Sequence, residues 1–236
     1  MIRGLHARTT ASVRPSRASE AGRTTAAHMA EALTGAGYVV VSGLAAGIDA
    51  AAHAAALDAS GRDESERVLN RVLAPIAKYW VCKRAPMVAA EAMECHGGNG
   101  FIEDHVMARL YRDAPLNGLW EGSGNVICLD VMRALSREKE ARRVLLGEIA
   151  QAKGAHKAMD AWLQADRPEM TEGNARRVVE DLALGMAASL LLRYAPAEVA
   201  DAFCATRLQR DYGMAFGTLP ESVGRNEILS RAAVEG

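Results

Sequence analysis

Beyond residue 63 the chain carries apolar residues at helical spacing. One stripe runs from Val68 to about Met93 and predicts a long amphipathic helix. Pro168 and Pro196 lie where later helices should be separated. Long helices with short connections predict an antiparallel helical bundle. The further helical patterns cover residues 103–111, 123–135, 137–164, 172–194, 197–211 and 222–233.

The pattern before residue 63 is different. A helical stretch over 22–36 is followed by a β-branched run at 38–42, a glycine loop and an Ala-rich helix at 50–59. This order predicts a partial Rossmann-like fragment over residues 13–63, because one strand cannot form a sheet by itself. Residues 1–12 read as a disordered basic arm. We therefore expect a mainly α protein whose helical domain spans residues 64–236.

Composition narrows the function classes. The 28 Lys and Arg residues nearly balance 29 Asp and Glu residues, so no net field attracts DNA or an anionic membrane. The longest apolar run, 182–192, is shorter than the ~20 residues of a membrane span. Four widely spaced cysteines predict reduced thiols, and Cys95 with His96 lacks a second ligand pair for a metal. We expect a cytoplasmic protein with neither a metal site nor a membrane contact.

Residues 120–125, W-E-G-S-G-N, precede a predicted helix. Glu121 could interact with the helix dipole while Ser123 caps the first turn. The flanking glycines also permit close approach of another molecule, so a catalytic carboxylate at Glu121 is the alternative to this local explanation. A second cluster, Gly97, Gly98 and Gly100, is either a turn or a phosphate-facing loop.

Four stretches taken in order carry a family resemblance. They are K-Y-W-V-C-K-R-A-P (78–86), E-A-M-E-C-H-G-G-N-G-F-I-E (91–103), L-Y-R-D-A-P-L-N (110–117) and W-E-G-S-G-N-V-I-C-L-D-V-M-R-A-L (120–135). Together they resemble the C-terminal helical domain of acyl-CoA dehydrogenases, in the alkylation-response (AidB-type) branch. The resemblance covers about residues 64–236.

The resemblance implies FAD-dependent oxidation of the CH–CH group of an acyl-CoA. Glu121 would remove the α-proton while the β-hydrogen leaves as hydride to the flavin. Gly97, Gly98 and Gly100 would approach FAD of a neighbouring subunit in a homo-oligomer, and Gly122, Ser123 and Asn125 would lie near the flavin. Members of the family also have an N-terminal helical domain and a central β-domain. Neither is recognisable in this sequence, so we expect an incomplete active site.

A second class of function is a helical module that binds DNA or another partner without catalysis. It would use Arg142, Arg143, Arg176 and Arg177 together with the N-terminal arginines. Residues 136–231 contain 14 basic and 14 acidic residues, so charge gives this idea little support.

Residues 13–62 have their own resemblance. S-R-A-S-E-A-G-R at 16–23 and V-V-S-G-L-A-A-G-I-D at 40–49 resemble the DprA (Smf) family of DNA-processing proteins. It implies that Arg17, Ser42, Gly43 and Gly47 face a DNA phosphate. Pro15 departs from the family's pattern.

Overall fold

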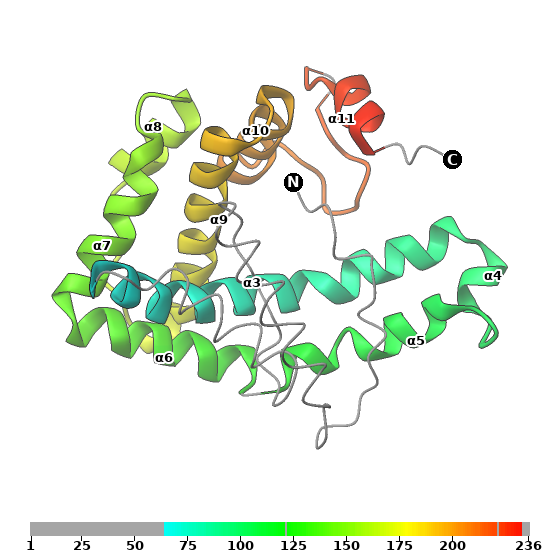
Figure 1. Ribbon diagram of the computed structural model, residues 1–236, viewed down its shortest axis with the longest axis horizontal. Helices are drawn as coiled ribbons and strands as arrows, with labels where there is room; N and C mark the ends of the chain where they lie inside the picture. The colour runs from blue at the N-terminus through cyan, green and yellow to red at the C-terminus, as the bar shows by residue number, and fades with distance from the viewer. Residues whose placement is uncertain (1–63, 121, 221, 233–236) are drawn as a thin grey trace. The chain divides into compact units, whose positions relative to one another are not determined.

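A computed structural model describes residues 64–120, 122–220 and 222–232 (Figure 1). These residues form helices and connecting loops, with no β-strand among them. The chain divides into two compact units, Met1–Ala141 and Arg142–Gly236. The mainly helical prediction is therefore confirmed. The predicted arm, Rossmann-like fragment and strand at 38–42 lie outside the described residues, and the boundary near residue 63 stays a prediction.

In the first unit, helix α3 (Glu64–Cys95) packs against α5 (Val106–Asp113) and α6 (Gly124–Arg137). Figure 1 shows α5 and α6 running back along α3 in the opposite direction. The short helix α4 (Gly98–Phe101) reverses the chain, and the 3-10 turn η1 (Leu116–Gly118) links α5 to α6.

The apolar stripe predicted from the sequence forms the core of this unit. Val72, Ile76 and Tyr79 of α3 are buried, as are Cys128 and Val131 of α6. Residues three or four apart share a helix face, so each helix presents one apolar side to the other. The helix continues through Pro75 and Pro86, although a proline inside a helix removes one backbone hydrogen bond.

In the second unit, α9 (Ala175–Tyr194) is the central helix. It contacts η2 (Ala150–Ala152), α8 (Lys157–Gln164), η3 (Glu172–Asn174), α10 (Ala197–Phe203) and the π-helical turn η4 (Cys204–Leu208). Its residues from Leu182 to Met186 are all buried, as expected for a helix surrounded by others. Helix α7 (Lys139–Ile149) directly precedes η2 in the chain. Helix α11 (Arg225–Ala232) follows η4 and packs on α10.

The pattern at 137–164 is not one helix. It breaks between Ala152 and Lys157, where Gly154 has a left-handed φ of 83°. Glycine adopts that conformation without steric cost and ends a helix. His156 then caps α8, because its Nδ1 accepts a hydrogen bond from the Ala158 amide at 3.0 Å. Within the described residues, every helix is too short or too polar to traverse a bilayer.

Candidate functional site

Trp120 and Gly124 lie against the middle of α3. A Cβ atom on Gly124 would lie 3.2 Å from Tyr79 Cε2 and 2.7 Å from Lys83 Cε. Gly122 has a φ of 113°, a conformation that L side chains rarely adopt. Gly122 is therefore needed by the fold, whereas at Gly124 an added Cβ would meet the flexible end of Lys83 and the edge of the Tyr79 ring. Glu121, between Trp120 and Gly122, lies outside the described residues, so its predicted catalytic role stays a prediction.

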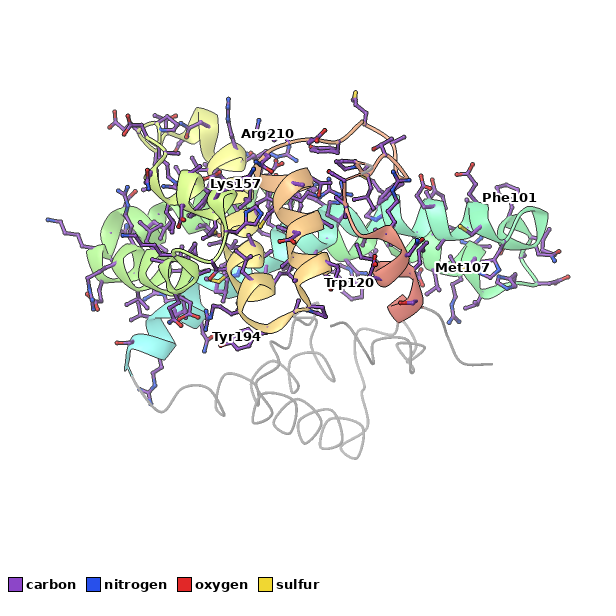
Figure 2. All side chains as sticks on the ribbon, turned by 90° about the horizontal axis from the view of Figure 1, so that it is seen from above. Phe101, Met107, Trp120, Lys157, Tyr194 and Arg210 are labelled. Carbon is purple, nitrogen blue, oxygen red and sulfur yellow. The ribbon has the colours of Figure 1, made fainter. Side chains whose placement is uncertain are left out.

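Lys78 ties this segment to α3. Its side chain is buried, at 3% exposure, and its Nζ donates a hydrogen bond to the Trp120 carbonyl oxygen at 2.5 Å. Figure 2 places Trp120 near the middle of the long helix. Helical spacing alone does not identify Lys78, since it assigns a lysine to the solvent face. Its position as the first residue of the K-Y-W-V-C-K-R-A-P motif was the available signal.

Ser123 occupies the N-cap position of α6, as the sequence predicts, with extended dihedral angles. Its hydroxyl makes no capping hydrogen bond, and the first turn of α6 carries no acidic residue. The prediction that Ser123 caps the helix is thus confirmed for its position, but its hydroxyl does not make the capping hydrogen bond. Ser123 and Asn125 are both exposed, at the helix end where the macrodipole favours a negative group.

The three glycines after α3 differ in backbone conformation and in the space around them. Gly97 has a φ of 57°, and a Cβ on Gly100 would lie 2.2 Å from the Met93 carbonyl oxygen. A Cβ on Gly98 would have nothing within 4 Å. The predicted turn therefore contains a short helix that needs Gly97 and Gly100. Gly98 is the member of this cluster that packing leaves unexplained.

The structure does not bring the two glycine segments together. Lys78, which binds Trp120, and Cys95, which ends α3, are 17 positions apart in one helix. At 1.5 Å per residue this separation is about 25 Å. Within one copy of the chain, Gly98 and Ser123 thus lie near opposite ends of that span.

The histidines near α4 have structural contacts. His96 and His105 have ring centroids 4.8 Å apart, and His105 Nδ1 accepts a hydrogen bond from the Met107 amide, which caps α5. Arg112 forms an ion pair with Glu103, whose carboxyl pKa this hydrogen bond lowers. In the described part of the chain, no group of three or more His, Cys, Asp or Glu side chains is placed to hold a metal ion.

The arginines of the DNA-binding interpretation are exposed on two helices. Arg142 and Arg143 lie on α7, and Arg176 and Arg177 lie in the first turn of α9. Arg17, Ser42, Gly43 and Gly47 lie outside the described residues.

Comparison with known proteins now defines the family. The family described as acyl-CoA dehydrogenase, C-terminal domain, matches residues 5–136, which is more than half of the chain. The chain belongs to the acyl-CoA dehydrogenase family. This match includes both glycine segments and most of α3 to α6. It also runs through residues 13–62, and the comparisons do not support the resemblance of that stretch to DNA-processing proteins.

Two relatives of this chain are longer proteins. AidB of Escherichia coli (strain K12), which carries an acyl-CoA dehydrogenase name, is 35% identical over 173 residues, covering 72% of this chain and 31% of AidB. Acyl-CoA dehydrogenase family member 11 of Caenorhabditis elegans is 31% identical over 110 residues, covering 47% of this chain and 18% of that protein. The chain thus spans about a third of the length of AidB.

Solved structures agree on the fold. The crystal structure of Caenorhabditis elegans ACDH-11 in complex with C11-CoA matches with a TM-score of 0.54 and 22% identity, over 78% of this chain and 34% of that one. The apo form of Bd2924 matches with a TM-score of 0.50 and 28% identity, over 62% of this chain and 29% of its own. These likenesses support the helical fold of the family's C-terminal domain.

Proposed function

We propose that this chain contributes to a FAD-dependent acyl-CoA dehydrogenase site, with Glu121 as the base that removes the α-proton of an acyl-CoA. One observation supports the proposal: the hydroxyl of Ser123, the N-cap residue of α6, is exposed and makes no capping hydrogen bond, two positions after Glu121 in the sequence. A serine hydroxyl and first-turn amides at that position can donate hydrogen bonds to an electron-rich cofactor. ACDH-11, which matches this chain in structure, was crystallised in complex with C11-CoA. This complex supports an acyl-CoA as the substrate class.

The residues present fit a flavin cofactor at two places. The open space at Gly98 lets a phosphate or an adenosine approach the backbone. Ser123 and Asn125 present polar atoms at the α6 N-terminus, where Gly122 removes a side chain from the approach. When bound, FAD supplies the hydride acceptor for the β-carbon. The chain's own contribution is to orient the substrate and to accept the α-proton on the Glu121 carboxylate.

The separation of about 25 Å along α3 bears on how the site is assembled. We propose that Gly98 of one subunit faces the cofactor whose flavin lies at Ser123 of another, in a homo-oligomer. Large apolar side chains on α3, α4 and α5 are exposed and could be covered by a second copy. They include Met87, Val88, Phe101, Ile102, Val106 and Leu110. Figure 2 shows Phe101 at the end of the first unit where α4 joins α3 to α5.

The test is retention of FAD. The purified chain is incubated with FAD, freed of unbound cofactor and examined by visible absorption; we expect a flavin band. Gly98→Ala should lower the retained flavin without changing the thermal unfolding midpoint, because the fold leaves room for a methyl group there. Glu121→Gln should retain flavin but abolish its reduction by acyl-CoA. A colourless wild-type protein, or acyl-CoA-dependent reduction in Glu121→Gln, would contradict the proposal.

A matched control is Gly147→Ala on α7, where a Cβ also meets nothing within 4 Å. This variant should retain flavin as the wild type does. Light scattering of the same samples measures the oligomeric state. A monomer that retains flavin would contradict the proposal that two subunits share the cofactor, but not the proposal that the chain binds FAD.

A further inference from the structure

Two helices, one in each unit, are capped by a histidine. His105 Nδ1 accepts a hydrogen bond from the Met107 amide at 3.3 Å at the start of α5. His156 Nδ1 accepts one from the Ala158 amide at 3.0 Å at the start of α8. Histidine is not among the usual capping residues, which are Ser, Thr, Asp and Asn. It differs from them because its charge changes between about pH 5 and pH 8.

The capping bond requires one protonation state of the ring. A neutral imidazole has one nitrogen that donates and one that accepts, whereas both nitrogens of an imidazolium donate. The Met107 amide is a donor, so His105 caps α5 only while its Nδ1 carries no proton. Protonation replaces the bond by two facing donors. It also places a positive charge at a helix N-terminus, where the macrodipole opposes it.

The two capping histidines differ in the group beside the ring. His156 Nε2 lies 3.9 Å from a carboxylate oxygen of Asp201, and a carboxylate stabilises a charged ring. The ring of His105 lies instead against that of His96, with centroids 4.8 Å apart and planes inclined at 46°. When both of these rings are protonated, they carry like charges at short range. Acid therefore acts on His105 through its cap and through its neighbour.

The other titratable side chains around this pair of rings are exposed or partly buried. Within the described residues, none of them is hydrogen-bonded or ion-paired to either imidazole. Water screens the fields of exposed charges, so the cap and the ring contact determine what protonation does. The side chains are Glu91, Glu94 and Cys95 at the end of α3, Glu103 and Asp104 before α5, and Arg109, Tyr111, Arg112 and Asp113 of α5, whereas α4 and η1 have none.

We propose that His96 and His105 form a proton-operated switch in the turn between α3 and α5. With neutral rings, His105 caps α5 and holds the turn in the observed form. When a proton binds to His105 Nδ1 at acidic pH, the cap is lost, the two rings repel each other and the first turn of α5 loosens. Gly98 lies between the two histidines in the chain, so the switch acts on the loop that we propose to approach the cofactor. Only this last consequence rests on the proposed function.

The test uses the full chain without FAD, containing ¹⁵N-labelled histidine. The chain has six histidines, and the ring signals that are absent from His105→Asn identify His105. At pH 8 these signals should show the tautomer with its proton on Nε2. At pH 5 the protection of the Met107 amide against hydrogen exchange, corrected for the intrinsic pH dependence of exchange, should be about fivefold lower than at pH 8. This is the effect expected for the loss of a helix cap.

Two variants separate the cap from the repulsion. Asparagine is a favourable N-cap that does not titrate, so His105→Asn should keep the Met107 protection at both pH values. His96→Gln removes the repulsion but keeps the cap. Met107 should then still lose protection at pH 5, whereas the Ile102 amide, which bonds to the Gly98 carbonyl, should lose less than in the wild type. An equal loss at Ile102 in His96→Gln and wild type would overturn the role of His96.

His156→Asn is the matched control, because it replaces the same kind of cap in the second unit. It should leave the acid response of Met107 unchanged, and a response abolished by this variant would overturn the assignment to His105.

The proposal is also overturned if neutral His105 carries its proton on Nδ1, or if His105→Asn loses Met107 protection as the wild type does. Equal protection of the wild-type Met107 amide at both pH values would overturn it too, and this measurement does not depend on any variant folding. Because no cofactor is present, a chain that retains no flavin contradicts the proposed function without affecting these results.

Discussion

The indole ring of Trp162 on α8 lies directly against Gly185 on α9. A Cβ atom on Gly185 would come within 2.3 Å of Trp162 Cζ2, which is far inside van der Waals contact. The ring cannot easily move away, because its Nε1 donates to Asp181 at 2.9 Å and the Arg167 guanidinium lies 3.9 Å over the ring centroid. This close approach positions α8 on the central helix of the second unit.

Gly185→Ala should therefore destabilise the protein. Forcing a methyl group into a packed contact costs about 1–3 kcal/mol, measured as a lower free energy of unfolding in urea. Gly147→Ala is the matched control on α7, where a Cβ meets nothing within 4 Å. Because alanine is the better helix former, that variant should gain up to about 1 kcal/mol. Equal unfolding of Gly185→Ala and wild type would show that the indole ring is free to move.

The ion pair between Glu148 and Arg193 should also matter. Arg193 donates to Glu148 Oε1 at 2.6 Å, and the two side chains are only 22% and 19% exposed. Burial opposes the charge of Arg193, but hydrogen bonds to Glu148 and Tyr194 prevail and raise its pKa. Glu148→Gln would leave a largely buried guanidinium without its counter-charge. We expect a loss of roughly 1–3 kcal/mol in the free energy of unfolding.

The pair of Asp130 and Arg133 serves as the exposed control. Its atoms are 2.5 Å apart, but both side chains are more than half exposed. Solvent screening makes such pairs worth about 0–1 kcal/mol, so Asp130→Asn should change the unfolding free energy little. A larger effect for Asp130→Asn than for Glu148→Gln would refute this ranking.

Much of the fold follows from the sequence because it depends on helical periodicity. The stripe that starts at Val68 predicts α3, and the apolar run at 182–192 predicts the buried part of α9. The break before Lys157 was missed, because Gly154 ends a helix through its dihedral angle rather than its hydrophobicity. Periodicity describes which face is buried, and it does not describe where the backbone turns.

The candidate site follows from the sequence less completely. The motifs locate Gly98 and Ser123, but only the structure separates Gly98 from Gly100, since that difference depends on the distance to the Met93 carbonyl. Lys78 could not be found from spacing, because its partner is a backbone oxygen 42 positions away. Every residue type has a backbone carbonyl, so a contact with that atom cannot be recognised from the sequence of the partner segment.

Substitutions at α4 should separate the glycine that packing requires, Gly100, from Gly98, at which packing leaves room for a side chain. In Gly100→Ala the new methyl group would meet the Met93 carbonyl at 2.2 Å, and a backbone atom cannot rotate away. We expect a loss of about 1–3 kcal/mol in unfolding free energy, measured in urea, together with loss of α4 helical contacts. Gly98→Ala should unfold like the wild type. Equal stability of the two variants would contradict the conclusion that Gly100 lies too close to the Met93 carbonyl to accept a side chain.

Alkaline pH should weaken the protein through Cys204. This residue of η4 is fully buried, and burial, with a further contribution from Asp201, raises the pKa of its thiol to about 11. An unfolded cysteine loses its proton near pH 8.5, so between about pH 9 and pH 11 the unfolded state holds fewer protons than the folded state. Stability then falls as pH rises through this window. Below pH 8.5 both states are protonated, and the contribution of Cys204 is fully present.

Cys204→Ala isolates this effect under reducing conditions. At pH 8 the variant should be less stable than the wild type because it loses buried volume. At pH 10.5 the difference in unfolding free energy between the two should be smaller, since the wild type alone must keep a thiol protonated. A Cys204→Ala difference that does not change with pH would mean that the Cys204 thiol ionises as easily in the folded protein as in the unfolded chain.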